Sequence, residues 1–369
     1  MLSNLMTVGG QVIMLFLMMI SGYCLGKTKL LPRSALPAFT NVVLYLALPC
    51  MLIGAFEMEA TAEKVHSFLA VLGATLLVHL LNFAVSHAAI RDPDDGRKRV
   101  LVACAVFSNC GFVGYPLLAS LMGDIGLFYG SAYNLVFTTL LWTLGLHYLQ
   151  GTKGGFRLKT LFLNPGIIGM AVGFAFFLFQ IQLPPVLQNT VDYLGNTAVS
   201  LPMLIIGCQL AHADLKKLLH DRWNLAASFL RLLVLPLLGL LVLRLIGLRG
   251  DVLVATIVCA AAPPAAAVAM LTENCGQDPV LASGVVSFQT LLSVLTMPVV
   301  VSIAQLFAGS VANARNRNVP GVFLIPAGNG GAGASGPGAP RGSPLRYPGG
   351  LPPARHWASE HRGRGGRKR

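Results

Sequence analysis

Long apolar stretches alternate with short polar ones from Leu5 to about Phe307. A membrane-spanning helix needs about 20 consecutive, mainly apolar residues. The pattern therefore predicts about ten membrane helices. The expected spans are residues 5–26, 33–55, 66–90, 98–122, 125–150, 158–180, 185–211, 223–246, 251–273 and 279–307.

The short loops between these spans carry their positive charge on one side only. Cations in short loops mark the cytoplasmic side of a membrane protein. The loops after the first, third, fifth and seventh spans hold 13 Lys and Arg residues, whereas the other loops hold Lys64 and Arg249 alone. This alternation supports the number of spans, and it predicts that both ends of the membrane body lie outside.

A stretch of the first half returns in the second half about 152 residues later. Leu48–Gly54 (LPCMLIG) resembles Leu201–Gly207 (LPMLIIG), Val100–Ala103 resembles Val252–Ala255, and Phe137-Thr138-Thr139 aligns with Phe288-Gln289-Thr290. Each copy holds five expected helices, and an odd number inserts the second copy upside down. We expect an all-α polytopic membrane protein with two inverted repeats, residues 1–154 and 155–310, followed by a separate segment 311–369.

Helix-breaking residues occupy matching places in the two copies. Gly111, Gly114 and Pro116 interrupt the fourth expected helix, and Pro263 and Pro264 interrupt the ninth. Paired interrupted helices are the best sequence indication of a secondary transporter's binding site, because the ends of half-helices attract ions. We expect the two breaks to cross, with a substrate-binding site formed by Asn109, Gly111, Tyr115, Pro116, Pro263, Pro264 and Arg231. The alternative is a pair of kinks that serve packing only.

Two ionisable residues inside the spans occupy equivalent repeat positions, His79 and Arg231. An ionisable residue inside a membrane is expensive and is a functional candidate. Arg231 could hold an anionic substrate or could bond structurally to carbonyls that a broken helix leaves free. His79 could carry a coupling proton or could be a satisfied buried histidine.

Polar residues also form matched faces on the fifth and tenth expected helices. Asn134 lies on the fifth, and Gln289 and Thr290 lie on the tenth. These side chains could line the transport cavity and act in coupling or gating, as His79 could. They could equally join membrane helices by hydrogen bonds.

The composition agrees with a membrane protein and excludes a soluble globule. The chain is 54% hydrophobic and 11% charged, with mean hydropathy +0.68. Its net charge of +13 comes mainly from the segment Arg315–Arg369, which holds ten Lys or Arg and one acid, so the rest carries 13 − 9 = +4. The charge is thus no indication of nucleic-acid binding. The Gly-, Pro- and Arg-rich tail is typical of disorder.

Motifs of enzymes and cofactor sites are absent from the sequence. Gly-rich phosphate loops, nucleophile elbows and metal-ligand clusters do not occur, and the seven cysteines form no CxxC pair. The sequence predicts neither an enzyme, nor a cofactor, nor a bound metal.

Four segments carry a resemblance to a known family: LPMLIIGCQL from Leu201, SNCGFVGYPLL from Ser108, RLLVLPLL from Arg231 and TLLSVLTMP from Thr290. In order and spacing the chain resembles the auxin efflux carrier family, and its short Gln150–Lys159 loop is similar to that of bacterial-type permeases. The resemblance implies crossed helices 4 and 9 with Asn109, Pro116 and Pro263 at the crossing. It further implies a homodimer in the bacterial cytoplasmic membrane, and organic anions such as malate or malonate as substrates.

The function predicted from these features is alternating-access transport of small mono- or dicarboxylates across the lipid bilayer, with proton or sodium coupling left open. The alternatives are a sodium-coupled organic-anion symporter of the bile-acid carrier type and a channel. A channel needs a continuous polar pore, whereas paired breaks near the midplane favour an occluded site.

Overall fold

The computed structural model describes residues 2–151, 165–211 and 217–308, and all its regular elements are helices. The loop cations Lys153, Arg157, Lys159 and Lys216 lie outside the described residues, as do the expected repeat boundary at 154–155 and the segment 311–369. The start of the sixth expected span, residues 158–164, also lies outside them.

The described helices of the first half follow the expected spans. The elements are α1 (Leu2–Lys27), α2 (Leu36–Val42) continued by α3 (Leu48–Ala55), α4 (Ala62–Ala89), α5 (Asp95–Val106), α6 (Tyr115–Met122), α7 (Asp124–Leu140) and α8 (Leu146–Gln150). Side chains start two of them, because the hydroxyl of Thr61 caps α4 and the carboxylate of Asp94 caps α5.

The second half follows the expected spans in the same way. Its elements are α10 (Pro165–Phe179), α11 (Pro185–Ala211), α12 (Arg222–Phe229), α13 (Leu235–Leu245), α14 (Gly250–Ala261), α15 (Ala266–Asn274) and α16 (Pro279–Ala308). Asp221 caps α12 by accepting hydrogen bonds from the amides of Trp223 and Asn224. The expected interruption of the ninth span is confirmed as the gap between α14 and α15.

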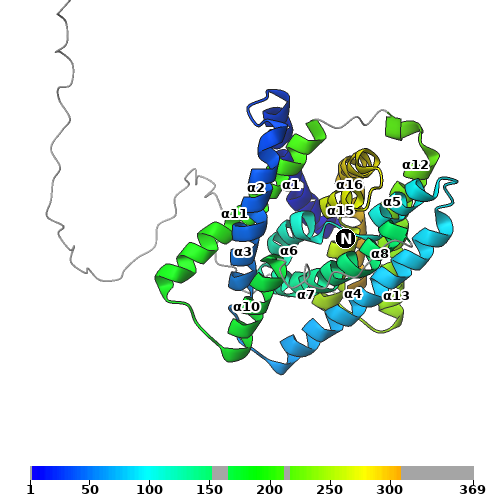
Figure 1. Ribbon diagram of the computed structural model, residues 1–369. Coiled ribbons are helices and arrows are strands. Elements are labelled where there is room, and N and C mark those ends of the chain that lie inside the picture. Colours follow the sequence, from blue (N-terminus) through cyan, green and yellow to red (C-terminus); the bar gives the residue numbers. More distant parts are fainter. Residues whose placement is uncertain (1, 152–164, 212–216, 309–369) are drawn as a thin grey trace, which may run out of the picture. The chain divides into compact units, whose positions relative to one another are not determined.

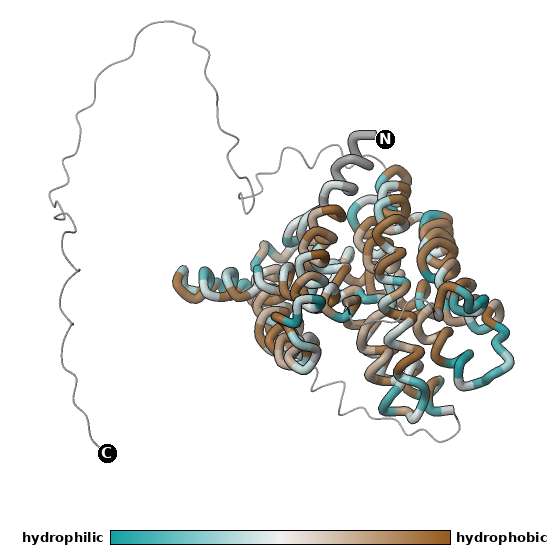
Figure 2. Tube along the Cα trace, turned by 90° about the horizontal axis from the view of Figure 1, so that it is seen from above, coloured by the Kyte–Doolittle hydropathy of each residue, from teal (hydrophilic) through white to brown (hydrophobic). Residues whose placement is uncertain are grey.

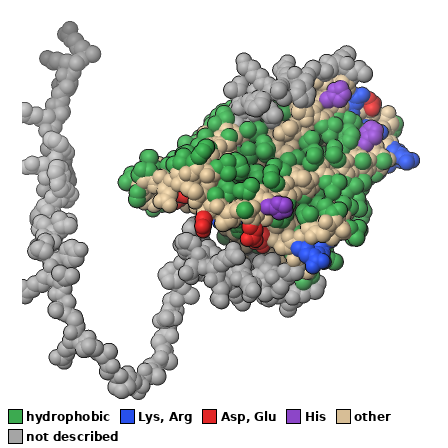
Figure 3. All heavy atoms as spheres, turned by 90° about the horizontal axis from the view of Figure 1, so that it is seen from below, with side chains coloured by type: hydrophobic (Ala, Val, Ile, Leu, Met, Phe, Trp, Pro, Cys, Tyr) green, Lys and Arg blue, Asp and Glu red, His purple; other side chains and the backbone are tan. Residues whose placement is uncertain are grey.

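Five helical stretches of the described residues are long and apolar enough to cross a membrane. They are Leu36–Ala55, Ala62–Ala89, Pro185–Ala211, Arg222–Leu245 and Pro279–Ala308, and shorter apolar helices fill most of the other expected spans. Polar residues gather at helix ends and connections (Figure 2), and one face is covered mainly by hydrophobic side chains (Figure 3). The structure is that of a multi-pass membrane protein, and the count of ten crossings stays a prediction.

The helices pack in two groups (Figure 1). In the first group, α1 lies along α11, and α3 contacts both α10 and α11. In the second group, α4 packs on α7, α14 and α15 pack on α16, and α13 packs on α14. The groups meet where α1 contacts α16 and α6, and where α3 contacts α7.

Three prolines inside the expected spans do not break their helices. Pro49, Pro116 and Pro236 each lie in the first turn of α3, α6 and α13, and a five-residue π-helix precedes each of these helices. The π-helices are residues 43–47, 110–114 and 230–234. Because proline lacks an N–H and clashes with the preceding turn, the wider π-turn lets the helix continue past it.

An ion pair joins the first turn of α5 to the residue that caps α12, two places that are far apart in the sequence. Arg97 donates to Asp221 Oδ2 at 2.5 Å and to Asp92 Oδ2 at 3.2 Å. Burial raises the pKa of Asp221, but the hydrogen bonds from Arg97 and from the amides of Asn224 and Trp223 outweigh it, so the pKa lies below its ordinary value. The hydrogen bond to Asp221 likewise raises the pKa of Arg97.

We expect this pair to give stability that disappears in acid. Because the folded pKa of Asp221 is lowered, its contribution is present above the unfolded value of about 4 and is lost as pH falls through the folded pKa. The pair is partly exposed, so we expect about 0.5–1 kcal/mol. Asp221→Asn keeps an oxygen for the cap, and its melting temperature should approach the wild-type value as the pH falls below about 4. A gap between the two proteins that widens in acid would contradict this assignment.

Candidate functional site

The fourth expected helix is interrupted earlier than its glycines and proline suggest. Helix α5 ends at Val106, Phe107 is extended, and Asn109 begins the next helical segment. The expectation that Gly111, Gly114 and Pro116 form the break was therefore wrong in position. These residues lie in the π-helix and the first turn of α6, where the wider turn accommodates the proline.

The second break is extended and contains both prolines. Helix α14 ends at Ala261, Ala262 and Ala265 have extended backbones, and α15 begins at Ala266. Two consecutive prolines remove two N–H donors and disfavour helix in the residue before them. The break therefore lies where the sequence predicts it.

The two breaks meet and pair as a single antiparallel bridge between Ser108 and Pro264. The Asn109 amide donates to the Pro263 carbonyl at 2.7 Å, and the Ala265 amide donates to the Phe107 carbonyl at 3.0 Å. The bridging residues themselves exchange no hydrogen bond, as in the non-hydrogen-bonded pairs of an antiparallel ladder. Proline's missing N–H is therefore no loss at this position.

The side-chain amide of Asn109 lies at the crossing and uses only its oxygen in contacts with the described residues. Its Oδ1 accepts from the Phe112 amide at 3.0 Å and so caps the following helical segment. Among the described residues, none accepts a hydrogen bond from Nδ2, and the side chain is 7% exposed. Two residues further on, a Cβ atom added to Gly111 would meet nothing within 4 Å beyond its own chain neighbours and helix backbone. The crossing thus presents a side-chain amide donor that no described residue uses.

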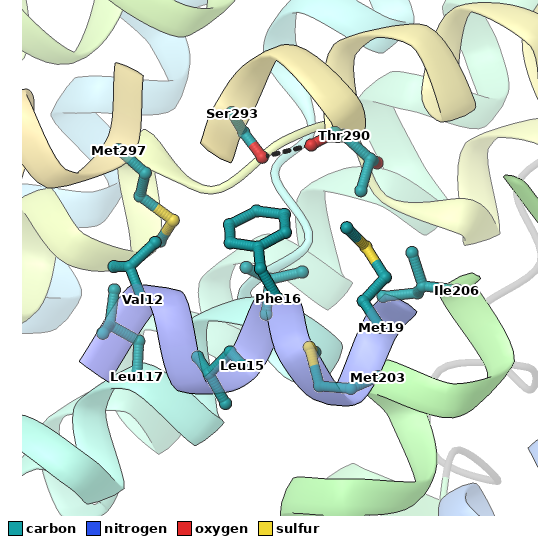
Figure 4. Close-up of a pocket in the computed structure, with 11 residues that line it drawn as sticks. Val12, Leu15, Phe16, Met19, Leu117, Met203, Ile206, Thr290, Ser293 and Met297 are labelled. Atoms are coloured by element: carbon teal, nitrogen blue, oxygen red, sulfur yellow. Dashed lines mark hydrogen bonds between the residues drawn. The ribbon is translucent and has the colours of Figure 1, made fainter. Parts of the chain in front are cut away.

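A mainly apolar cavity lies against the second half of the interrupted helix (Figure 4). Its volume is about 20 Å³, room for little more than one water molecule. Val113, one turn beyond Asn109, and Leu117 line it from one side, while residues of α1, α11 and α16 line the others. Two hydroxyls reach its wall, those of Thr290 and Ser293, and both donate to backbone carbonyls of α16.

Arg231 is fully buried and contacts both breaks through backbone carbonyls. Its Nε and Nη2 donate to Ala262 and Ala260, and its Nη1 donates to Ala105 and Val106. This geometry is that of the structural alternative, an arginine on freed carbonyls. A direct contact of Arg231 with substrate stays a prediction, and in this conformation all its nitrogens already donate.

His79 is also completely buried, among aromatic rings. Its Nδ1 lies 2.9 Å from the Thr75 carbonyl, which requires Nδ1 to carry a proton, and in the neutral ring Nε2 is then an acceptor. The Tyr133 ring centroid lies 5.3 Å away and that of Phe107, in the first break, lies 6.1 Å away. Among the described residues, none donates to Nε2. The role of His79 in proton coupling stays a prediction.

The other residues predicted for the site are buried and contact neighbouring helices. Tyr115 is fully buried with its ring against Gly130 of α7, and Pro116 is buried beside it. Asn134 of α7 accepts a hydrogen bond from the Cys110 thiol at 3.4 Å, which joins α7 to the segment after the first break. The sequence reasoning missed Ser108, whose hydroxyl lies 3.0 Å from that of Tyr133 at the bridge itself.

Gln289 is a buried polar residue whose side-chain amide forms no hydrogen bond with the described residues. Its side chain is 0% exposed, and among the described residues none bonds to its Nε2 or its Oε1. A buried amide without partners lowers stability by about 1–3 kcal/mol. We therefore expect Gln289→Leu to leave the melting temperature unchanged or to raise it, while transport falls if the amide serves the moving substrate. A strong loss of stability, measured on the purified protein, would show instead that the amide is already bonded.

Two interrupted helices that meet inside a multi-pass helical body are typical of many secondary transporters. The chain matches the family described as "Membrane transport protein" over residues 7–160 and 154–301, and it belongs to this family. It is therefore a transporter and not an enzyme.

Similar proteins carry transporter names as well. The chain is 26% identical to an uncharacterized transporter of Methanothermobacter thermautotrophicus, over 78% of this chain and 95% of that protein. It is 23% identical to an uncharacterized transporter of Methanocaldococcus jannaschii, over 65% and 80%. It is also 23% identical to a Rhizobium meliloti protein named "Putative malonate transporter", over 78% and 93%.

Proposed function

We propose that this protein is a secondary carrier that moves small organic anions, such as mono- or dicarboxylates, by alternating access. The observation that carries the proposal is the backbone pairing of the two breaks, where no described residue accepts a hydrogen bond from the Asn109 side-chain amide. An amide N–H that meets a carboxylate forms a charge-assisted hydrogen bond, which is among the stronger kinds. The name of the Rhizobium relative makes malonate the first substrate to test.

The proposal includes two inverted five-helix repeats whose breaks alternate between the two sides of the membrane. The antiparallel direction of the bridge supports it, because equivalent segments of two inverted repeats run in opposite directions where they meet. The mutual packing of α1, α3, α10 and α11 favours a scaffold made of these helices, separate from the interrupted ones. We propose that this group also forms a homodimer interface, and that the protein lies in the cytoplasmic membrane.

The test is uptake into proteoliposomes that contain the purified protein. A panel of radiolabelled mono- and dicarboxylates, including malonate and malate, is offered with and without a pH gradient. We expect saturable uptake of at least one organic anion and none of matched neutral amides. Uptake that never saturates, or that passes inorganic ions at high rate, would favour a channel and contradict the carrier.

A further inference from the structure

The last carbonyls of α5 and α14 are left without helical partners at the crossing. The helical partner of the Ala105 carbonyl would be the Asn109 amide, which instead donates to Pro263. The helical partner of the Ala260 carbonyl would be the N–H of residue 264, which is a proline. Carbonyls at a helix C-terminus carry partial negative charge. The two half-helices thus bring a cluster of electronegative oxygens together inside the protein.

The side chain of Arg231 fills this cluster of carbonyl oxygens. Five hydrogen bonds run from the Arg231 guanidinium to four carbonyls: Nε to Ala262 at 3.1 Å, Nη2 to Ala262 at 2.5 Å and Ala260 at 2.9 Å, and Nη1 to Ala105 at 3.2 Å and Val106 at 3.4 Å. A guanidinium has five N–H donors. Every donor is therefore used, and the oxygens come from both interrupted helices.

A second contact places the same helix beside α5 along its length. Asp221 at the start of α12 bonds to Arg97 in the first turn of α5, and Arg231 bonds to the carbonyls that end α5. Nine residues separate Arg97 from Val106 and ten separate Asp221 from Arg231, which are about 14 and 15 Å of helix. The two segments are therefore joined by hydrogen bonds at both ends, and their lengths between these contacts are nearly equal.

In carriers with interrupted helices, unwound carbonyls and half-helix C-termini are the groups that coordinate a coupling cation such as sodium. We propose that Arg231 is a built-in cation that occupies this position. It holds the two half-helix ends together, and the carrier completes its cycle without sodium. Among the described residues Arg231 has no carboxylate partner in an ion pair, so its charge is met by carbonyl dipoles alone. The positive charge of Arg231 lies beside Val106, three residues before Asn109, and it favours an anion near Asn109.

The first arm of the test measures uptake by the wild-type protein in proteoliposomes. An inward gradient of sodium chloride is compared with one of choline chloride at equal ionic strength and pH. We expect equal rates. Uptake that depends on the sodium gradient would overturn the proposal. This arm rests on the proposed carrier function, and it needs one anion that is transported.

The second arm needs no substrate and uses Arg231→Ala. Removal of the side chain empties the carbonyl cluster, so a small cation that fits it should bind and raise the melting temperature. We expect about 20 mM guanidinium chloride to stabilise Arg231→Ala relative to choline chloride, and to restore part of its uptake. Neither the wild type nor Arg244→Ala, a change in the partly exposed arginine of the same helix, should respond.

Each result of the second arm decides the assignment. If Arg231→Ala folds only when it is purified with guanidinium, the proposal is supported. If it folds and neither guanidinium nor sodium changes its melting temperature, Arg231 does not fill a cation position. Arg231→Lys keeps the charge with three donors in place of five, and it should fold with a lower melting temperature and stay independent of sodium. Absence of all anion uptake would reject the proposed function and leave this arm valid.

Discussion

Gly207→Ala is expected to destabilise the protein strongly, because α1 and α11 touch through their backbones at this position. A Cβ atom on Gly207 would overlap the Met19 carbonyl and crowd the Tyr23 amide nitrogen. Gly22 of α1 has the same relation to the Leu204 carbonyl. Close packing through small residues is how membrane helices associate. Since backbone atoms cannot rotate away, the two helices must separate to admit even one methyl group.

We expect the loss to lie at or above the upper end of the range of about 1–3 kcal/mol found for overpacked sites. The measurement is the melting temperature and the monodisperse fraction of the purified protein in detergent. Gly73→Ala in α4 is the matched control, since its Cβ would meet nothing within 4 Å. Alanine favours helix over glycine by about 1 kcal/mol, so this control should be neutral or stabilising. Equal behaviour of the two variants would contradict the packing of α1 on α11.

The double change Pro263→Ala, Pro264→Ala is expected to abolish transport. It converts the segment from Ala260 to Ala267 into eight consecutive alanines, the residue with the highest helix propensity. Helices α14 and α15 should then join, and the amides of Asn109 and Ala265 would lose their partners across the bridge. Pro263→Ala alone should have a smaller effect, because Pro264 still interrupts the helix.

Uptake and hydrogen exchange on the purified variants check this expectation. Pro298→Ala, a change in the partly buried proline inside α16, is the control for loss of a proline from a membrane helix, and it should keep most of the activity. Amides around residue 263 should exchange more slowly in the double variant, as in a continuous helix. Wild-type uptake by the double variant would show that the break at α14 and α15 has no part in transport.

The sequence predicts the helical segments and the second break well, because both depend on local chemistry. Apolar runs of spanning length place the helices, and two adjacent prolines cannot continue one. The first break was misplaced because Pro116 is accommodated by a π-turn, whereas Phe107 and Ser108 are extended through pairing with Pro263 and Pro264. That pairing is tertiary, and no local pattern reveals it.

The role of Arg231 shows the same limit. A buried arginine was found from the sequence, and two explanations for it stayed open. Its partners Ala105 and Ala262 are 126 and 31 residues away, and they are alanines whose side chains give no signal. Only the fold shows that their carbonyls are free and adjacent. That none of the described residues bonds to the Gln289 amide is likewise visible only after its neighbours are placed.

Substrate affinity of Asn109 variants tests the central claim, that the carboxylate binds at the crossing. Asn109→Ser and Asn109→Asp both keep an oxygen that can cap the Phe112 amide, so the local helix should remain, and melting temperatures verify this. Neither keeps the Nδ2 donor. For the anion with the best uptake, we expect Asn109→Ser to bind about ten- to a hundredfold more weakly, the equivalent of about 1.5–3 kcal/mol for a lost hydrogen bond to a charged group. Asn109→Asp should bind still more weakly because its carboxylate repels the anion. Wild-type affinity in both variants would place the substrate elsewhere and contradict the account.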